Sequence, residues 1–293
     1  MRQALGAKPC RFCRLPVVFC FVIATYHNHS KWSDGSATFA EIYACAEGLG
    51  VDILGLSDHL CIYPDGTSPK WSMSPSRTED YLTEVCSFRG AGKIEVRVGL
   101  ELDWLGKERN AMTQIAGRLP LDYRIGSVHH VEGQQFDASP SYWSEKSAEE
   151  RDAVFAKYWG LVRDMAASSF FDIAAHLDLA KKLGYQPTSD PSPAIDAALD
   201  AIAESRMVVE LNTSGFSRPC ADAYPSLEIL KRCRGRGIAI TLSADGHIPG
   251  HLIYEFERGL ARLHQAGFTS IARFREREKW FEPLGDALKR GRA

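Results

Sequence analysis

The sequence lacks the charge imbalance that is typical of proteins that bind nucleic acid over a wide surface. It carries 35 Lys and Arg residues against 37 Asp and Glu residues, which gives a formal net charge of -2. No basic excess and no acidic tail is present, so we expect no nucleic-acid partner. A phosphorylated ligand would instead need a local pocket of basic side chains.

The sequence also lacks the close cysteine spacing of a small disulfide-stabilised domain. Its eight cysteines are spread over 293 residues, which favours reduced thiols and a cytoplasmic location. Cys10 and Cys13 form a single C-x-x-C pair. Without a second pair, this spacing is only a weak indication of a metal site.

A hydrophobic run long enough to cross a membrane is missing near the amino terminus. The run LPVVFCFVIAT ends at Thr25 and is shorter than the roughly 20 residues of a spanning helix. Because Arg11 and Arg14 precede it, the run also resembles the centre of a signal peptide, and this alternative stays open. Cleavage there would remove the strand that leads to His27 and His29. We therefore favour a buried first strand after an extension, residues 1–15, without fixed structure.

Short apolar runs alternate with longer amphipathic segments along the chain. The runs predict strands at 17–25, 51–58, 94–102, 123–129, 170–176, 207–214 and 237–245, and the segments predict helices at 37–50, 77–90, 147–167, 192–205 and 224–237. This alternation predicts a parallel sheet with helical crossovers. Continuously apolar strands indicate a sheet covered on both faces. Residues 16–293 are therefore expected to form one α/β domain, and residues 61–77 a long loop that could cover a site.

Ionisable side chains gather where the predicted strands end. In an α/β barrel these ends converge on one mouth, where active sites are built. Residues two apart in a strand face the same side, so the H-x-H pair can bind one ion together. The side chains concerned are His27, His29 and Asp34 after the first strand, then His59, Glu101, His129, His176, and finally Asp245 with His247.

So many imidazole and carboxylate groups at one mouth indicate a cluster of metal ions. A lone histidine is more often structural, but six of the nine histidines in this chain fall at strand ends. His130 is the exception, because it points to the face opposite His129. Imidazole and carboxylate ligands suit zinc, iron or manganese. One tetrahedral ion cannot use all of them, so two or three divalent transition metals are expected.

The order of these motifs resembles the polymerase-and-histidinol-phosphatase (PHP) superfamily. The resemblance runs from about residue 24 to 275 and rests on H-x-H, SDH, GLELDW, DYRIGSVHH, FDIAAHLDLAKKLG, VVELNTSGFSRP and TLSADGHIPG. The stretch ELNTSGFSRPCADAYPSLEIL is similar to the histidinol-phosphatase branch in particular. The resemblance implies a distorted (β/α)7 TIM-like barrel with a trinuclear metal centre. It also implies hydrolysis of L-histidinol phosphate in histidine biosynthesis.

The resemblance assigns the metal ligands position by position. Many relatives have a histidine at the position of Gly35, whereas this chain has a carboxylate one residue earlier, at Asp34. The implied ligands are His27, His29, Glu101 and Asp245 for one metal, Glu101, His129 and His176 for a second, and His59, His247 and Asp34 for a third.

The resulting hypothesis is a metal-dependent phosphomonoesterase that acts on a small phosphorylated metabolite. A hydroxide between two metals would attack phosphorus, with Glu101, Asp245, His247 and Arg218 at the catalytic centre. Arg218, Lys181 and Lys182 are candidates to bind the phosphate, because cationic donors pair with phosphoryl oxygens. No Ser or Cys nucleophile signature is visible, so a phospho-enzyme is not expected.

Further readings of the same residues stay open. Asp103 and Trp104, near the end of the third strand, could meet a cationic part of the substrate. The protein could also be a PHP-type phosphoesterase for another phosphomonoester, a nucleotide or a phosphodiester. A nuclease would need a basic groove with aromatic residues, which the balanced charge disfavours. A non-catalytic PHP module is a further alternative, and the complete set of ligand positions disfavours it.

Overall fold

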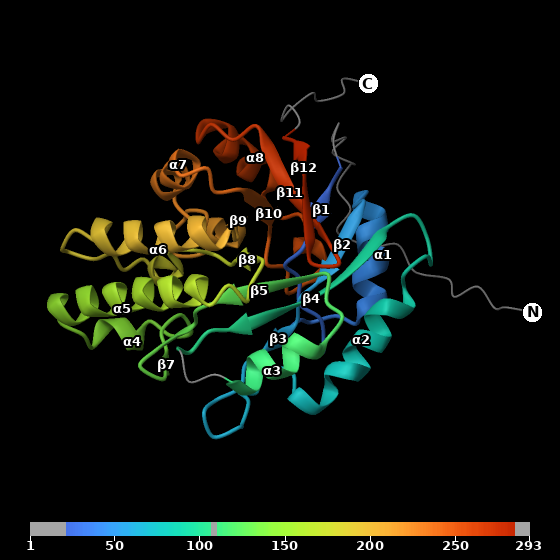
Figure 1. Cartoon of the computed structure of the whole chain (residues 1–293), viewed down its shortest axis with the longest axis horizontal. Coiled ribbons are helices and arrows are strands. Elements are labelled where there is room, and N and C mark those ends of the chain that lie inside the picture. Colours follow the sequence, from blue (N-terminus) through green and yellow to red (C-terminus); the bar gives the residue numbers. More distant parts are fainter. Residues whose placement is uncertain (1–21, 107–109, 285–293) are drawn as a thin grey trace, which may run out of the picture.

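Parallel strands form the centre of the computed structural model, which describes residues 22–106 and 110–284 (Figure 1). The sheet order is β1-β2-β4-β5-β8-β9-β10, and the short β3 (His59–Leu60) pairs with β4. The seven strands of this path are β1 (Ala24–Thr25), β2 (Ile53–Leu56), β4 (Glu95–Asp103), β5 (Tyr123–Ser127), β8 (Ile173–Ala174), β9 (Val208–Asn212) and β10 (Ile240–Ser243).

The sheet closes on itself almost completely, which confirms the predicted (β/α)7 barrel. Each neighbouring pair on the path is parallel. A parallel bridge between Asn28 and Gly246 joins the segments that follow β1 and β10. There the amide of His29 donates to the carbonyl of Gly246 at 2.9 Å. Seven strand ends therefore meet at one mouth.

Several strands are shorter than the sequence predicts. The first predicted strand begins at Val17, but residues 17–21 lie outside the described residues, as do residues 1–15 with Cys10 and Cys13. The fifth strand, predicted over 170–176, is only two residues long as β8. It ends early because His176 takes a φ of 20°, which is incompatible with strand geometry.

Helices cover the outside of the barrel. Figure 1 shows α5 and α6 side by side on one flank and α1 and α2 on the other. The five predicted helices are confirmed, and α3, α4 and α8 add to them. The helices are α1 (Phe39–Leu49), α2 (Thr78–Ser87), α3 (Asn110–Arg118), α4 (Ser141–Ser144), α5 (Ala148–Ala167), α6 (Ser192–Ser205), α7 (Leu227–Gly235) and α8 (Phe256–Gln265).

Short 3₁₀ turns supplement these helices at the mouth and in the loops. They are η1 (Pro75–Arg77), η2 (Leu179–Lys181), η3 (Ser214–Ser217) and η4 (Pro249–His251). The hairpin β6 (His130–Val131) and β7 (Gln134–Gln135) extends the β5 loop. Among the helices in the described part of the chain, none is both long and apolar enough to cross a membrane.

The sequence contains the residues that cap the amino-terminal end of α5, the longest helix. Ser147 precedes α5, its hydroxyl accepts from the amide of Glu150, and the Glu150 carboxylate accepts from the amide of Ser147. This capping box satisfies amide groups that have no partner inside the helix.

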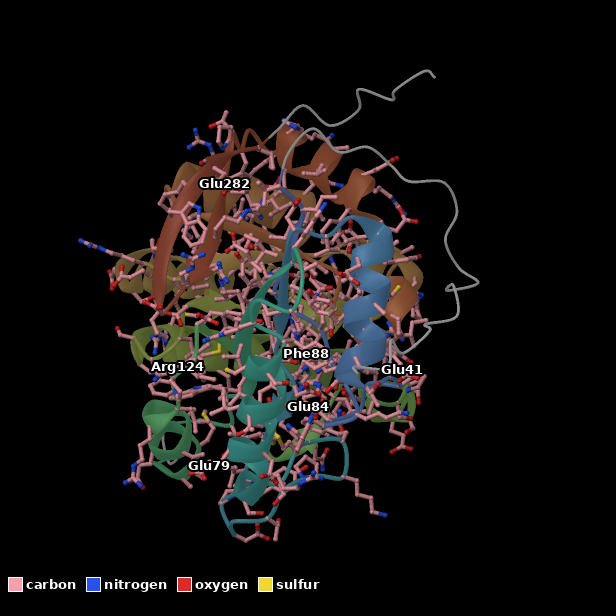
Figure 2. All side chains as sticks on the ribbon, turned by 90° about the vertical axis from the view of Figure 1, so that its right-hand side faces the viewer. Glu41, Glu79, Glu84, Phe88, Arg124 and Glu282 are labelled. Carbon is pink, nitrogen blue, oxygen red and sulfur yellow. The ribbon has the colours of Figure 1, made fainter. Side chains whose placement is uncertain are left out.

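On the opposite flank, Figure 2 shows α1 and α2 packed together, with Phe88 at their junction. The Phe88 ring lies 4.6 Å from that of Phe39.

Aromatic side chains fill the barrel below the mouth. Tyr26 packs edge-on against Tyr123 at 5.1 Å and against Phe274 at 5.3 Å between ring centroids. The Tyr123 hydroxyl donates to the carbonyls of Tyr26 and Leu56 at 2.6 and 3.0 Å. Phe274 belongs to the hairpin β11 (Ser270–Arg275) and β12 (Glu278–Pro283), which covers the far end of the barrel (Figure 1). The packed interior leaves the carboxyl ends of the strands as the place for a site.

Candidate active site

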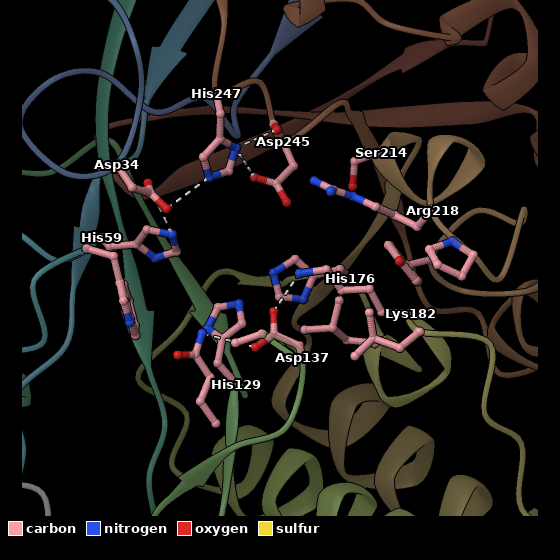
Figure 3. A pocket seen from close by; sticks show the side chains of 17 residues that line it. Asp34, His59, His129, Asp137, His176, Lys182, Ser214, Arg218, Asp245 and His247 are labelled. Atoms are coloured by element: carbon pink, nitrogen blue, oxygen red, sulfur yellow. Dashed lines mark hydrogen bonds and ion pairs between the residues drawn. The ribbon is translucent and has the colours of Figure 1, made fainter. Parts of the chain in front are cut away.

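A cavity of about 450 Å³ opens at the carboxyl ends of the strands. Figure 3 shows the charged side chains that face it. It brings together nearly all of the predicted site residues, although they are far apart in the sequence. Those that line it directly are Asp34, His59, His129, His176, Lys182, Arg218, Asp245 and His247.

Glu101 is buried beneath this cavity, surrounded by imidazole rings. Its Oε2 is 2.9 Å from His27 Nε2 and 3.0 Å from His59 Nδ1. Its Oε1 is 3.0 Å from His176 Nε2 and 3.6 Å from His129 Nε2. Burial opposes ionisation of this carboxyl, but the neighbouring His59 and His27 hold its pKa well below the usual range. His29 Nε2 also lies 3.4 Å from Oε2. One ionised carboxylate is thus shared among five imidazoles.

The H-x-H pair lies beside Asp245. Asp245 Oδ1 is 3.0 Å from His29 Nε2 and 3.6 Å from His27 Nε2. The two imidazole rings are 5.1 Å apart between centroids. The same oxygen is 3.4 Å from His247 Nδ1. His27 and His29 thus point to the same side, as expected for residues that are two apart in an extended segment.

Asp34 lies at the outer edge of the cluster, where the resemblance implied a third metal. Its Oδ2 is 3.3 Å from His247 Nε2, and its Oδ1 is 3.7 Å from His59 Nε2. At the next position, a Cβ added to Gly35 would lie 2.2 Å from the carbonyl oxygen of His29. This backbone therefore accepts only glycine at position 35, and the carboxylate of Asp34 reaches the histidines instead.

The donor set fits metal ions better than it fits hydrogen bonding. Both ring nitrogens of His29, Nδ1 of His129 and Oδ1 of Asp245 are buried without a hydrogen-bond partner in the described residues. Such groups are costly to bury unless a partner satisfies them. Divalent cations would do so, because His29, His129 and Asp245 belong to clusters of three or four residues whose donor atoms lie within 4.8 Å of one another. Imidazole and carboxylate donors together suit zinc, iron or manganese.

The carboxylates also set the charge of the imidazoles. Burial lowers the pKa of His59 to about 4. For His247, burial acts in the same direction, but Asp245 and Asp34 outweigh it and raise the pKa to about 9. For His129, Asp103 likewise outweighs burial and raises the pKa to about 10. Since a metal ligand must be a neutral imidazole, metal binding at His129 and His247 would release protons.

The predicted phosphate-binding cations differ in where they lie. Figure 3 shows the guanidinium of Arg218 directed into the cavity, and within the described residues it has no hydrogen bond or ion pair. Lys182 lines the cavity and pairs with Asp137 at 2.7 Å. Lys181 does not reach the cavity. It is 6% exposed, and its Nζ lies 2.9 Å from Asp222 and 2.8 Å from the carbonyl of Ala223.

Asp103 and Trp104 do not face the cavity, so the expectation that they could meet a substrate is wrong. Trp104 is buried against Phe171 at 5.8 Å between ring centroids. Asp103 lies behind the cluster, where Oδ1 is 3.3 Å from His129 Nδ1 and Oδ2 is 3.1 Å from His130 Nδ1.

Sequence reasoning also missed residues that belong to the site. Trp71, Gln135, Asp137, Ser214 and Tyr224 line the cavity. Glu210 lies behind it, with Oε1 2.8 Å from His27 Nδ1. The signal for Glu210 was available, because it is a charged residue in the middle of the apolar run MVVELN. A carboxylate in a buried strand needs a partner.

The chain is similar in sequence to proteins that are already known. The PHP domain model matches residues 25–214. A protein of Deinococcus radiodurans named probable histidinol-phosphatase is 30% identical over 246 residues, which are 83% of this chain and 92% of that protein. The histidinol-phosphatase of Lactococcus lactis is 22% identical, over 85% of this chain and 93% of that protein.

A solved structure has the same fold. It is the crystal structure of histidinol phosphate phosphatase from Lactococcus lactis, in complex with zinc, L-histidinol and phosphate. It superposes with a TM-score of 0.72 at 21% identity, over 88% of this chain and 98% of that one. The likeness extends over nearly the full length of both chains, so the barrel is the architecture of the whole described region.

Proposed function

The chain belongs to the PHP domain family, and on this premise we propose that it is a metal-dependent histidinol-phosphatase. It would hydrolyse L-histidinol phosphate to L-histidinol and phosphate, as a step of histidine biosynthesis. The observation that carries the proposal is the placement of six histidines and three carboxylates at one barrel mouth. Arg218 lies beside them and forms no ion pair with any residue that the structure describes. The named activities of the similar proteins from Deinococcus and Lactococcus support it.

We assign the ligands to three positions around the shared Glu101. The metals are zinc, iron or manganese, and zinc is the metal named in the Lactococcus structure. The distances of 3.0 Å from His59 to Glu101 and 3.3 Å from His247 to Asp34 support adjacent positions. The three sets are His27, His29, Glu101 and Asp245, then Glu101, His129 and His176, then His59, His247 and Asp34.

The chain's own residues bind and orient the phosphate ester. Bound divalent metals would lower the pKa of a water molecule and take up negative charge on the phosphoryl oxygens. Arg218 presents a guanidinium that can donate two parallel hydrogen bonds to phosphoryl oxygens. Lys182 would add a second positive charge, partly balanced by Asp137. Lys181 is left out of this assignment, because its ammonium group already has three oxygen partners.

The remainder of the cavity wall would hold the organic part of the substrate. Trp71 lies 4.8 Å from His59 between ring centroids, and Asp137 is buried on the side of His129. An aromatic face and a carboxylate suit a ligand with a flat ring or a positive charge. The substrate is thus a small phosphorylated metabolite, and we keep the prediction that the protein acts in the cytoplasm.

A comparison of substrates tests this proposal. Manganese-loaded protein is assayed for phosphate release from L-histidinol phosphate and p-nitrophenyl phosphate, and for cleavage of a dinucleotide. We expect kcat/KM for L-histidinol phosphate to exceed the other two values by orders of magnitude. Equal, slow turnover of both monoesters would contradict the substrate assignment, and preference for the dinucleotide would favour the phosphodiesterase alternative.

A further inference from the structure

The motif ELNTS, residues 210–214, begins on β9 and contributes no ligand to the proposed metal centre, yet its first residue lies directly behind that centre. Glu210 is 0% exposed. The side chain is therefore a buried carboxylate whose two oxygens must be satisfied by neighbours.

One oxygen of Glu210 orients His27. Oε1 lies 2.8 Å from His27 Nδ1, while His27 Nε2 lies 2.9 Å from Glu101 and 3.6 Å from Asp245. A hydrogen bond from Nδ1–H to Glu210 leaves the lone pair of Nε2 directed toward the other two carboxylates. Such carboxylate–histidine pairs fix the tautomer that a metal requires.

The other oxygen of Glu210 holds the backbone of a second ligand. Oε2 accepts from the amide of His176 at 2.9 Å. His176 has a φ of 20°, at the edge of the region that residues with a side chain avoid. This backbone directs His176 Nε2 to within 3.0 Å of Glu101. A single carboxylate thus contacts one ligand in the segment after β1 and one in the segment after β8.

Glu210 is itself held in place from the same strand. Asn212 Nδ2 donates to Glu210 Oε2 at 3.0 Å. Asn212 Oδ1 accepts from the amide and the hydroxyl of Ser214 at 3.0 and 2.7 Å. Ser214 begins the η3 turn that leads to Arg218. The motif therefore links the ligands of the centre to the turn that carries the cavity's guanidinium.

We propose that Glu210 is a positioning residue that presents His27 and His176 to the metals together. The inference rests on the metal centre of the proposed function, and it does not depend on the identity of the substrate. Its test can therefore use metal binding alone.

The substitution Glu210→Gln keeps the shape of the side chain almost unchanged, but it prevents the side chain from making both contacts at once. The amide has one oxygen and one NH2 group. If the NH2 faces His27, it requires the opposite tautomer, which places a proton on Nε2. If the NH2 faces His176 and Asn212, it meets two other donors. In either orientation one contact is lost, so both ligands cannot be held as they are in the wild type.

Metal-free wild-type and Glu210→Gln proteins are dialysed against a series of free Mn²⁺ concentrations, and bound metal per chain is measured. We expect the variant to bind at least one ion about 10- to 100-fold more weakly. The visible absorption bands of the Co²⁺-loaded variant should also shift, because the geometry of a coordinated imidazole changes. Wild-type affinity together with an unchanged Co²⁺ spectrum would overturn the inference.

Asp122→Asn is the matched control. Asp122 is also a buried carboxyl that accepts from backbone amides, those of Val98 at 2.8 Å and Glu276 at 3.1 Å, but it lies at the other end of the barrel. We expect this variant to lose stability and to keep wild-type metal affinity and Co²⁺ bands. Equal loss of metal in both variants would mean that Glu210 acts only through stability, and the inference would be wrong.

A measurement on the unmodified protein covers the case in which Glu210→Gln does not fold. In ¹⁵N NMR of Zn²⁺-loaded protein with labelled histidine, His27 should carry its proton on Nδ1 and bind metal through Nε2. The reverse assignment would overturn the inference. Protein that binds metal as expected but does not hydrolyse L-histidinol phosphate would contradict the proposed function alone.

Discussion

Glu101 is the side chain on which the cluster depends most. It lies within 3.0 Å of nitrogens from His27, His59 and His176. Glu101→Gln removes the negative charge and one acceptor oxygen without changing the size of the side chain. Loss of an outer partner costs roughly 10- to 100-fold in metal affinity or activity, so we expect loss of a shared ligand to lower kcat by more than about 100-fold.

The check is metal analysis together with steady-state kinetics of Glu101→Gln. We expect fewer than the wild-type number of metal ions per chain. The exposed Glu41→Gln on α1 is a control that should change neither quantity. Full metal content and full rate in Glu101→Gln would show that this carboxylate is not a shared ligand.

Arg218 is expected to act on substrate binding. A hydrogen bond to a charged group contributes about 1.5–3 kcal/mol, which corresponds to about a 10- to 100-fold change in binding. Arg218→Ala should therefore raise KM for the phosphomonoester by about that factor. The metal content should stay unchanged, since Arg218 contacts no proposed ligand. Arg163→Ala on the outer face of α5 is the control, and it should leave KM unchanged. An unchanged KM in Arg218→Ala would mean that another residue binds the phosphate.

At the scale of elements, the packing inside the barrel predicts how two glycine-to-alanine substitutions change the free energy of unfolding. A Cβ at Gly99 on β4 would lie 2.3 Å from the ring of Tyr123, whereas a Cβ at Gly160 on α5 would meet nothing within 4 Å. Gly99→Ala should lower the free energy of unfolding by about 1–3 kcal/mol, because overpacking displaces Tyr123. Gly160→Ala should raise it by roughly 0.5–1 kcal/mol through helix propensity.

Chemical denaturation of the two alanine variants tests that prediction. Both add one methyl group to a glycine, so the comparison isolates the environment of the site. Equal stabilities would contradict the packing of Tyr123 against β4.

The element order and the strand-end ligands were predictable because they depend on local patterns. Apolar runs, cap residues such as Ser147 and the two-residue spacing of His27 and His29 are all readable along the chain. The sequence did not show which of two neighbouring side chains faces the cavity. Lys181 turns inward and Lys182 faces the cavity because the η2 turn follows Asp178, which has a φ of 59°.

Contacts between residues far apart in the chain could also not be predicted from the sequence. Glu210 and His27 are 183 residues apart, and no local pattern pairs them. Asp34 reaches the outer histidines because Gly35 lies against the backbone of His29, a contact that exists only after folding. The structure was needed wherever a role depends on which side chain of a motif points into the mouth.

For the molecule as a whole, the central claim is that one barrel mouth holds a cluster of divalent metals around Glu101. Anomalous X-ray diffraction from crystals of the Mn²⁺-loaded protein tests it most directly. We predict two or three manganese peaks in the cavity, at least one within bonding distance of Glu101 and one beside Asp34 and His247. The absence of peaks in this cavity, or a single peak remote from Glu101, would contradict the account.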